Sequence, residues 1–238
     1  MESEERGRRP APADVLDGRL YPDLIQRGGL APAMSRLAHE HGIVLGEIRT
    51  RPGRNGGGLF NAAEVDSDRG VISVLLGSEE RRFSLSVFEE GVREWAAGAT
   101  GDLLDAVKVA EAWRNGTGLE ELTGLFPFMT TTPLALAYES GDPVATQWDR
   151  LLGHDEYVRE RPLLRRAHAN SRLRPLFPVI SHGTLRLSLD SRDRTAEEIW
   201  ISPLANGVFR VESTRRTEPK PEVGSMDDAI EVAASYLA

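Results

Sequence analysis

The chain has 238 residues, contains no cysteine and carries a formal net charge of −8 at pH 7. This length allows one large domain or two small ones with a substantial core. The lack of cysteine excludes disulfides, thiolate nucleophiles, zinc–thiolate sites and iron–sulfur clusters, and the excess of acidic residues argues against a general nucleic-acid binder.

The N-terminal stretch is charged and contains proline, so we expect residues 1–13 to form a disordered tail. It lacks the apolar segment of a signal peptide, and no apolar run approaches the roughly 20 residues that span a bilayer. The sequence therefore predicts a cytoplasmic protein that does not contact membranes. Residues 14–98 are expected to form an N-terminal α+β region.

One helix and several short strands are expected in this first region. Apolar residues recur at helical spacing from Leu30 to His41, and Gly42 supplies the stop signal. A strand is predicted from Ile43 to Ile48. The glycine-rich stretch from Arg51 to Gly58 is expected to be a flexible loop. It lacks the lysine and the strand-to-helix context of a phosphate-binding loop. A short strand follows near Ala62 to Val65.

A hairpin is expected next. A turn over Ser67–Gly70 precedes a strand from Val71 to Leu76, which we expect to pair with a second arm from Arg81 to Phe88. In the second arm apolar and polar residues alternate, which is typical of a sheet with one solvent-facing side.

Residues 99–238 are predicted to contain a mainly helical middle, followed by a C-terminal sheet and a last helix, and can pack with the first region as a single domain. Helical spacing predicts helices over four segments, the last interrupted or restarted at Pro162: Gly101–Arg114, Glu120–Leu125, Pro143–Leu152 and Asp155–Ala169. Strands are predicted over three further segments: His182–Leu189, Glu198–Ser202 and Gly207–Ser213.

A final helix is expected to begin after Ser225, which can cap it. The order of elements predicts an α+β fold, with antiparallel sheet segments at both ends of the chain around the helical middle. Nothing in this order indicates successive βαβ units.

The window from Arg161 to Leu189 contains no acidic residue but six arginines and two histidines. The arginines are Arg161, Arg165, Arg166, Arg172, Arg174 and Arg186. A guanidinium presents a rigid set of donors that suits carboxylate or phosphate, so this cluster is a candidate anion-binding site. The alternative is that acidic residues of other segments cover it as surface ion pairs. The candidate partners for such pairs are Asp142, Asp149, Glu120 and Glu121.

The strand predicted from His182 would place four polar residues on one face and leucines on the other. These four are His182, Thr184, Arg186 and Ser188. Since histidine side chains can take up and release a proton near neutral pH, His182 is a candidate general acid or base. Ser181 and His182 would point to opposite faces, so a nucleophile and base pair is not expected. An ordinary solvent-facing strand explains the same pattern.

His168 is the second catalytic candidate, since Arg165 and Arg172 flank it at helical spacings. Trp148 is a candidate wall of the binding site. His39 and His41 stand two positions apart on a predicted helix and so do not chelate a metal together. No cofactor motif occurs either, so we expect a fold that needs neither metal nor cofactor.

Several phrases of the C-terminal part resemble an actinobacterial family of unknown function whose members carry the label of natural-product biosynthesis proteins. They are WRNGTGLEELTGLFPFM, ESGDPVATQW, RPLLRRAHA, LRPLFPVISHGTLRLS and SMDDAIEVAA. The resemblance covers roughly Trp95 to the C-terminus and carries no known catalytic residues. What it implies is a setting in natural-product biosynthesis.

Two functional hypotheses follow from these observations. In the first, the protein is an accessory or tailoring protein for a ribosomally made peptide, and its Arg/His-rich face holds an acidic peptide or a phosphorylated intermediate, alongside other biosynthetic enzymes. In the second, it is a non-catalytic interaction module of the immunity or chaperone type. The residues leave open whether the protein is an enzyme.

Overall fold

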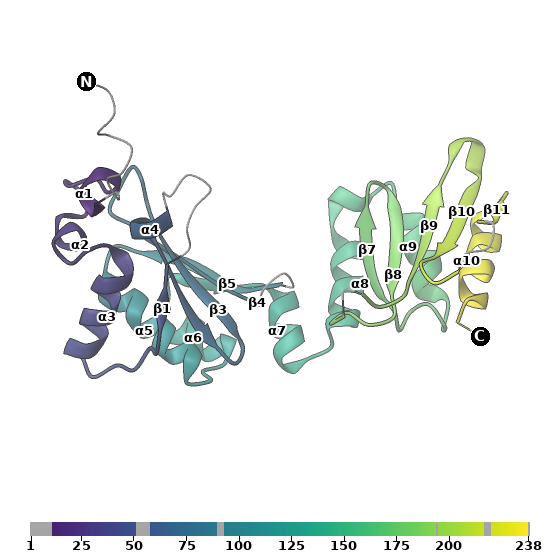
Figure 1. Ribbon diagram of the computed structural model, residues 1–238. Coiled ribbons are helices and arrows are strands. Elements are labelled where there is room, and N and C mark those ends of the chain that lie inside the picture. Colours follow the sequence, from purple (N-terminus) through teal and green to yellow (C-terminus); the bar gives the residue numbers. More distant parts are fainter. Residues whose placement is uncertain (1–10, 51–57, 90–92, 194, 217–219, 238) are drawn as a thin grey trace, which may run out of the picture. The chain divides into compact units, whose positions relative to one another are not determined.

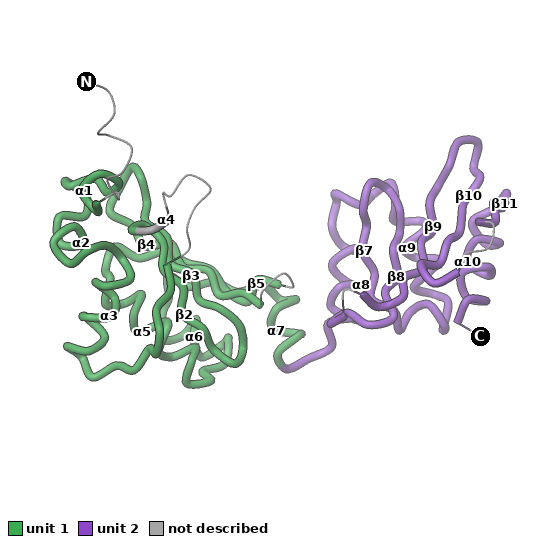
Figure 2. The backbone as a smooth tube through the Cα atoms, viewed as in Figure 1, with its two compact units in different colours: residues 1–139 green, residues 140–238 purple. Residues whose placement is uncertain are grey.

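The computed structural model describes residues 11–50, 58–89, 93–193, 195–216 and 220–237. The chain divides into two compact units, residues 1–139 and residues 140–238 (Figure 1, Figure 2). Each unit has an antiparallel sheet and its own hydrophobic core. The predicted α+β class is therefore confirmed.

The sheet of unit 1 is an antiparallel meander in which each strand pairs with the next one along the chain. Its strands are β1 (Ile48–Arg49), β2 (Ala62–Ser67), β3 (Gly70–Leu76), β4 (Phe83–Glu89), β5 (Arg93–Thr100) and β6 (Met129–Thr131). The helices of this part of the chain are α1 (Pro12–Val15), α2 (Pro22–Gln26), α3 (Leu30–Glu40), α4 (Gly58–Asn61), α5 (Leu103–Arg114), α6 (Leu119–Leu125) and α7 (Pro133–Ser140).

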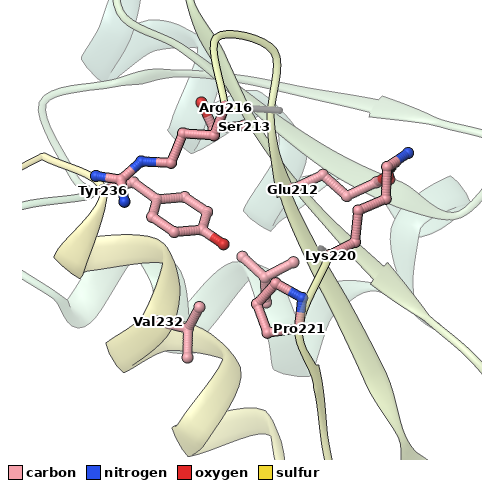
Figure 3. A pocket seen from close by; sticks show the side chains of 8 residues that line it. Glu212, Ser213, Arg216, Lys220, Pro221, Val232 and Tyr236 are labelled. Atoms are coloured by element: carbon pink, nitrogen blue, oxygen red, sulfur yellow. Dashed lines mark ion pairs between the residues drawn. The ribbon is translucent and has the colours of Figure 1, made fainter. Parts of the chain in front are cut away.

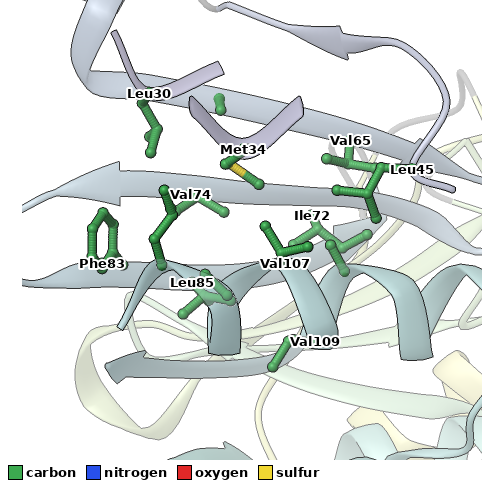
Figure 4. Packing of buried hydrophobic residues seen from close by; sticks show 14 of the residues in the cluster. Leu30, Met34, Leu45, Val65, Ile72, Val74, Phe83, Leu85, Val107 and Val109 are labelled. Carbon is green, nitrogen blue, oxygen red and sulfur yellow. The ribbon is translucent and has the colours of Figure 1, made fainter. Parts of the chain in front are cut away.

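The core of unit 1 lies between this sheet and helices α3 and α5 (Figure 4). Met34 of α3 and Val107 of α5 are fully buried, together with Ile72 and Val74 of β3. The alternation predicted for residues 81–88 is confirmed, because β4 buries every second residue from Phe83. Burying one such side chain contributes about 1.5–3 kcal/mol to stability. Together the buried side chains hold the sheet in place against α3 and α5.

Helix α2 is tied to the turn between β3 and β4. The Tyr21 hydroxyl lies 2.9 Å from the carbonyl oxygen of Gly77 and accepts a hydrogen bond from the Arg82 amide at 3.1 Å. Nearby, the Arg81 guanidinium donates to both carboxylate oxygens of Asp23, at 2.8 and 3.0 Å. These hydrogen bonds with Arg81 hold the pKa of Asp23 below its ordinary value of 3.8.

We expect this pair to make the stability of unit 1 sensitive to acid. A carboxyl whose pKa is lowered by folding stabilises the folded state above its unfolded pKa, and this contribution is lost as the pH falls through the folded pKa. Arg81→Ala should therefore reduce the difference in the free energy of unfolding between about pH 5 and about pH 3. Urea unfolding at both pH values measures it, with Arg82→Ala as the control; an unchanged difference in Arg81→Ala would contradict the assignment.

Unit 2 has a second antiparallel meander, in the order β11-β10-β9-β8-β7. Its strands are β7 (Phe177–Ser181), β8 (Thr184–Ser188), β9 (Glu198–Pro203), β10 (Phe209–Ser213) and β11 (Glu222–Val223). Its helices are α8 (Pro143–Gly153), α9 (Arg161–Ala169) and α10 (Met226–Ser235), with short 3-10 turns η2 (Asp155–Tyr157) and η3 (Ala205–Gly207).

The sheet of unit 2 buries alternate residues against its helices. Leu185 and Leu187 of β8 and Ile201 of β9 are fully buried in a cluster that includes residues of α8, α9 and α10. The residues between them, such as Arg186 and Trp200, are half-buried and point to the opposite face. Ser225 caps α10 as expected, with its hydroxyl accepting a hydrogen bond from the Asp228 amide at 3.1 Å.

Several expected elements differ from the structure. The strand predicted from Ile43 to Ile48 is wrong for most of its length, because only Ile48–Arg49 is extended into a strand and Gly46 has a φ of 70°. Strand β5 was not predicted, since its Ala-Ala-Gly-Ala stretch has low β propensity. It is held by pairing with β4 on one side and β6 on the other.

Unit boundaries also differ from the expected regions. The expected division after residue 98 falls inside β5, and the observed division lies after residue 139. Helices α5 and α6 contribute to the core of unit 1. The expected tail of residues 1–13 lies mostly outside the described residues, but α1 begins at Pro12. The expected loop over Arg51–Gly58 also lies outside them, except for Gly58, which begins α4.

Candidate functional site

The arginine-rich window lies in unit 2 and covers α9, the turns that follow it, and the hairpin of β7 and β8 (Figure 1). Strand β7 was not predicted, because Pro178 interrupts its pattern of hydrogen-bond donors. It is an edge strand, and Gln147 of α8 donates a hydrogen bond to the Pro178 carbonyl at 3.0 Å. This contact places α8 beside the hairpin.

Three arginines of the window have carboxylate partners. Arg166 donates to Asp227 at 2.5 Å, and Arg161 lies 3.5 Å from Asp155 and donates to the His154 carbonyl at 2.9 Å. The ion-pair alternative therefore holds for these side chains. The partners differ from the expected ones; Asp142, for example, caps α8 by accepting hydrogen bonds from the first amides of the helix.

Arg186 is the third paired arginine. Its guanidinium makes a bidentate contact with Glu198, with distances of 2.7 to 2.9 Å, and lies 5.0 Å from the centre of the Trp200 ring. The Trp200 indole also donates to Glu198, at 2.6 Å. A guanidinium satisfied in this way has little capacity left for a ligand. Arg186 therefore stabilises the pairing of β8 with β9.

Three arginines remain exposed and have no carboxylate partner within the described part of the chain. They are Arg165 on α9 and Arg172 and Arg174 on the turn that follows, and we call them the unpaired arginines. The turn is ordered by Asn170, whose side-chain oxygen accepts from the Arg172 amide at 3.0 Å. Leu173, between the two arginines, is fully buried. The cationic side chains therefore project from a fixed backbone.

Trp148 lies beneath this turn. Its side chain is 1% exposed, and its indole donates to the carbonyl oxygens of Arg174 at 2.9 Å and Leu176 at 3.1 Å. The ring of His168 is half-buried and packs 5.2 Å from it. Trp148 was expected to wall a binding site, but the structure places it in the core, where it supports the turn.

His182 does not lie on a strand. It forms the tip of the β7–β8 hairpin together with Gly183, with φ values of 50° and 78°. The expected face of His182, Thr184, Arg186 and Ser188 is therefore wrong at its first member and correct for the other three, which alternate with buried leucines on β8. A two-residue hairpin turn of type I′ has positive φ at both positions, and the glycine after His182 was the available signal.

The turn also brings Ser181 and His182 together. The Ser181 hydroxyl lies 3.2 Å from Nδ1 of His182, so the expectation that the two side chains point to opposite faces is wrong. Thr184 has a separate partner, since its hydroxyl lies 3.0 Å from that of Ser202. In the part of the chain that the structure describes, His182 contacts neither the unpaired arginines nor His168.

The sequence analysis did not predict a cleft at the edge of this sheet opposite β7. The cleft has a volume of about 290 Å³ and lies between the end of β10, the residues just before β11 and the end of α10 (Figure 3). Its lining residues are Val211, Glu212, Ser213, Arg216, Lys220, Pro221, Val232 and Tyr236. In the sequence, only the basic residues Arg215 and Arg216 after β10 point to a ligand site in this region.

In residues 11–50, 58–89, 93–193, 195–216 and 220–237, no group of three or more histidine, aspartate or glutamate side chains is placed to hold a metal ion. No helix within these ranges has both the length and the apolar character needed to cross a membrane.

A family model matches part of the chain, whereas no curated protein and no solved structure matches it. Where the sequence suggested a resemblance from about Trp95 onward, the matching region begins at residue 142. Residues 142–237, almost the whole of unit 2, match the model of a family of unknown function, DUF6193.

Proposed function

We propose that this protein is an accessory or tailoring protein in the biosynthesis of a peptide natural product, and that unit 2 holds an acidic segment of that peptide. The observation that carries the proposal is the set of unpaired arginines, Arg165, Arg172 and Arg174, exposed on and just after α9. The resemblance of the C-terminal part to proteins labelled for natural-product biosynthesis supports the setting.

Binding is favoured over catalysis by the positions of the histidines. His182 is exposed at a hairpin tip, where its ring contacts the hydroxyl of the neighbouring Ser181. His168 packs on the buried Trp148 ring. A general base must lie within hydrogen-bond reach of the proton that it removes, in a site that also holds the substrate. The unpaired arginines instead offer a cationic surface that a carboxylate can reach from solvent.

A non-catalytic interaction module is the second candidate function. The observation that favours it is the sheet face opposite the helices of unit 2, where Trp200 and Val179 are half-buried on neighbouring positions of β9 and β7, on either side of Arg186. Aromatic residues beside arginine are common at protein interfaces.

Arg172→Ala combined with Arg174→Ala should weaken binding of a hexaglutamate peptide by about tenfold at low salt, since each exposed ion pair contributes up to about 1 kcal/mol. The fold should stay intact because both side chains are exposed. Calorimetry at low and at physiological salt measures the affinity, which should fall with salt in the wild-type chain.

The matched control is Arg19→Ala combined with Arg36→Ala, which removes the same charge from exposed positions of unit 1. If the two double variants lose the same amount of affinity relative to the wild-type chain, the attraction is a net-charge effect and the proposed surface is wrong. The biosynthetic pathway encoded by the neighbouring genes can then be reconstituted with wild-type protein, with His182→Ala and without the protein. This comparison separates a catalytic or accessory role from that of an interaction module. Identical product from all three would favour the interaction module.

A further inference from the structure

The cleft between β10, β11 and α10 has an apolar floor. Val232 of α10 and the ring of Tyr236, the residue after α10, face it, and Pro221 closes it from the position just before β11 (Figure 3). The walls are held in place, because the Val211 amide donates to the Pro221 carbonyl at 3.1 Å. Helix α10 is packed onto the sheet through buried Ala229 and Ala233.

Charge in this cleft is unevenly compensated. Lys220 forms an ion pair with Glu212, on the side of the cleft away from Tyr236 (Figure 3). Arg216 lies with its guanidinium carbon 4.5 Å from the centre of the Tyr236 ring, and within the described residues no carboxylate pairs with it. One positive charge therefore stands beside an apolar floor.

The backbone that carries Arg216 is ordered. Its amide donates to the Ser213 carbonyl at 3.3 Å, and the preceding amide, of Arg215, donates to the Ser213 hydroxyl at 3.2 Å. The same hydroxyl donates to Glu197 at 2.7 Å. A guanidinium placed by a fixed turn and packed on an aromatic ring loses less freedom when it binds an anion.

We propose that this cleft binds a monocarboxylate with a small branched apolar body, its carboxylate on Arg216 and its apolar part on Val232 and Pro221. A planar guanidinium matches a carboxylate with two parallel hydrogen bonds. The cleft, about 290 Å³, is at the small end of ligand pockets, which suits a group the size of one amino-acid residue. A free acid and the C-terminal residue of a peptide share this chemistry. The inference is independent of the proposed function, which rests on other arginines.

The direct test compares N-acetyl-L-leucine with N-acetyl-L-leucinamide, which have nearly the same size and apolar group but differ in charge. NMR titration of the full chain should show saturable shifts at the cleft residues with the acid, with a millimolar Kd. The amide should bind at least about tenfold more weakly, because it lacks the charge-assisted hydrogen bonds. Equal binding of the acid and the amide, or no saturable shift with the acid, overturns the proposal.

Two variants locate the site. Arg216→Gln keeps a planar polar side chain without charge and should weaken acid binding at least about tenfold. Arg215→Gln is the matched control and should leave it unchanged, because Arg215 is the neighbouring residue, its side chain is 73% exposed and it pairs with Glu197 outside the cleft. Thermal unfolding checks that both variants fold; equal binding by Arg216→Gln and the wild-type chain contradicts the assignment.

A final pair of ligands identifies the source of the carboxylate. 4-Methylpentanoate represents a free acid, and acetyl-Ala-Ala-Leu represents a peptide C-terminus. Tighter binding of the peptide supports a C-terminus as the natural ligand, and equal binding supports a free acid. If neither competes with N-acetyl-L-leucine, the cleft does not recognise the shared group and the proposal is wrong.

Discussion

Trp148→Ala should remove about 3–5 kcal/mol from the free energy of unfolding of unit 2, the range for deleting a large buried aromatic side chain. The side chain is 1% exposed, so little of the cavity can be filled by solvent or by collapse of a surface loop. Two carbonyl oxygens, those of Arg174 and Leu176, also lose their indole donor. Leaving a buried polar group unpaired adds to the cost.

Unit 1 should be spared, because it has a separate core. Hydrogen exchange of the full chain followed by mass spectrometry, at increasing denaturant, measures each unit by its own peptides. Peptides of residues 140–237 should exchange at much lower denaturant in Trp148→Ala, and those of residues 11–50 should not change. Unchanged exchange in both units would show that Trp148 does not support unit 2.

Trp200→Ala is the matched control, since it deletes the same side chain from the same unit. Trp200 is half-buried on the open face of the sheet and donates a single hydrogen bond, to Glu198. We expect a loss of about 1–2 kcal/mol. A loss equal to that of Trp148→Ala would mean that the sheet face opposite the helices is as important to stability as the core.

Gly70→Ala should reduce the free energy of unfolding of unit 1 by about 3 kcal/mol or more. Gly70 begins β3 with a φ of 117°, a region that alanine rarely adopts. An added Cβ would lie 2.4 Å from the carbonyl oxygen of Phe88. That atom belongs to the backbone of β4, which is paired with β3 through Val71, so it cannot move without breaking the ladder.

Two glycines serve as controls for this prediction. Gly116→Ala tests the backbone conformation alone, because Gly116 has a φ of 87° but nothing lies within 4 Å of the added Cβ; a loss of about 1 kcal/mol is expected. Gly124→Ala adds a methyl in open space on α6 and should stabilise by about 0.5–1 kcal/mol. Urea unfolding measures all three, and an equal loss for Gly70→Ala and Gly116→Ala would contradict the proposed clash.

Local patterns of the sequence determined much of the secondary structure of this protein. Alternation predicted β4, the arm from Phe83, and the inward-facing leucines of β8, because successive side chains of a strand point to opposite faces. Helical spacing with a capping residue predicted α10 after Ser225 and placed α5 within residues 101–114. These signals involve neighbours in the chain and need no knowledge of the rest of the fold.

Elements whose stability comes from their neighbours in space were missed. Strand β5 lies between β4 and β6, and β7 lies beside α8. Each strand therefore gains hydrogen bonds that cannot be predicted from its own residues. His182 shows the same limit at a single residue: alternation extended the strand through it, whereas the register of β7 with β8 places it in the turn. Pairing decides such cases, because it is set between segments.

For the candidate site, the sequence alone determined where the cationic residues are concentrated, and only the tertiary structure decided which of them are available. Arg166 is paired with Asp227, 61 positions away, whereas Arg172 and Arg174 stay exposed on the turn above Trp148. The cleft at Arg216 likewise combines residues of β10, of the segment between β10 and β11, and of the C-terminal helix region. Charge density is a property of the chain, but a partner or a cleft forms only when distant segments pack together, and that packing selects the residues left to meet a ligand.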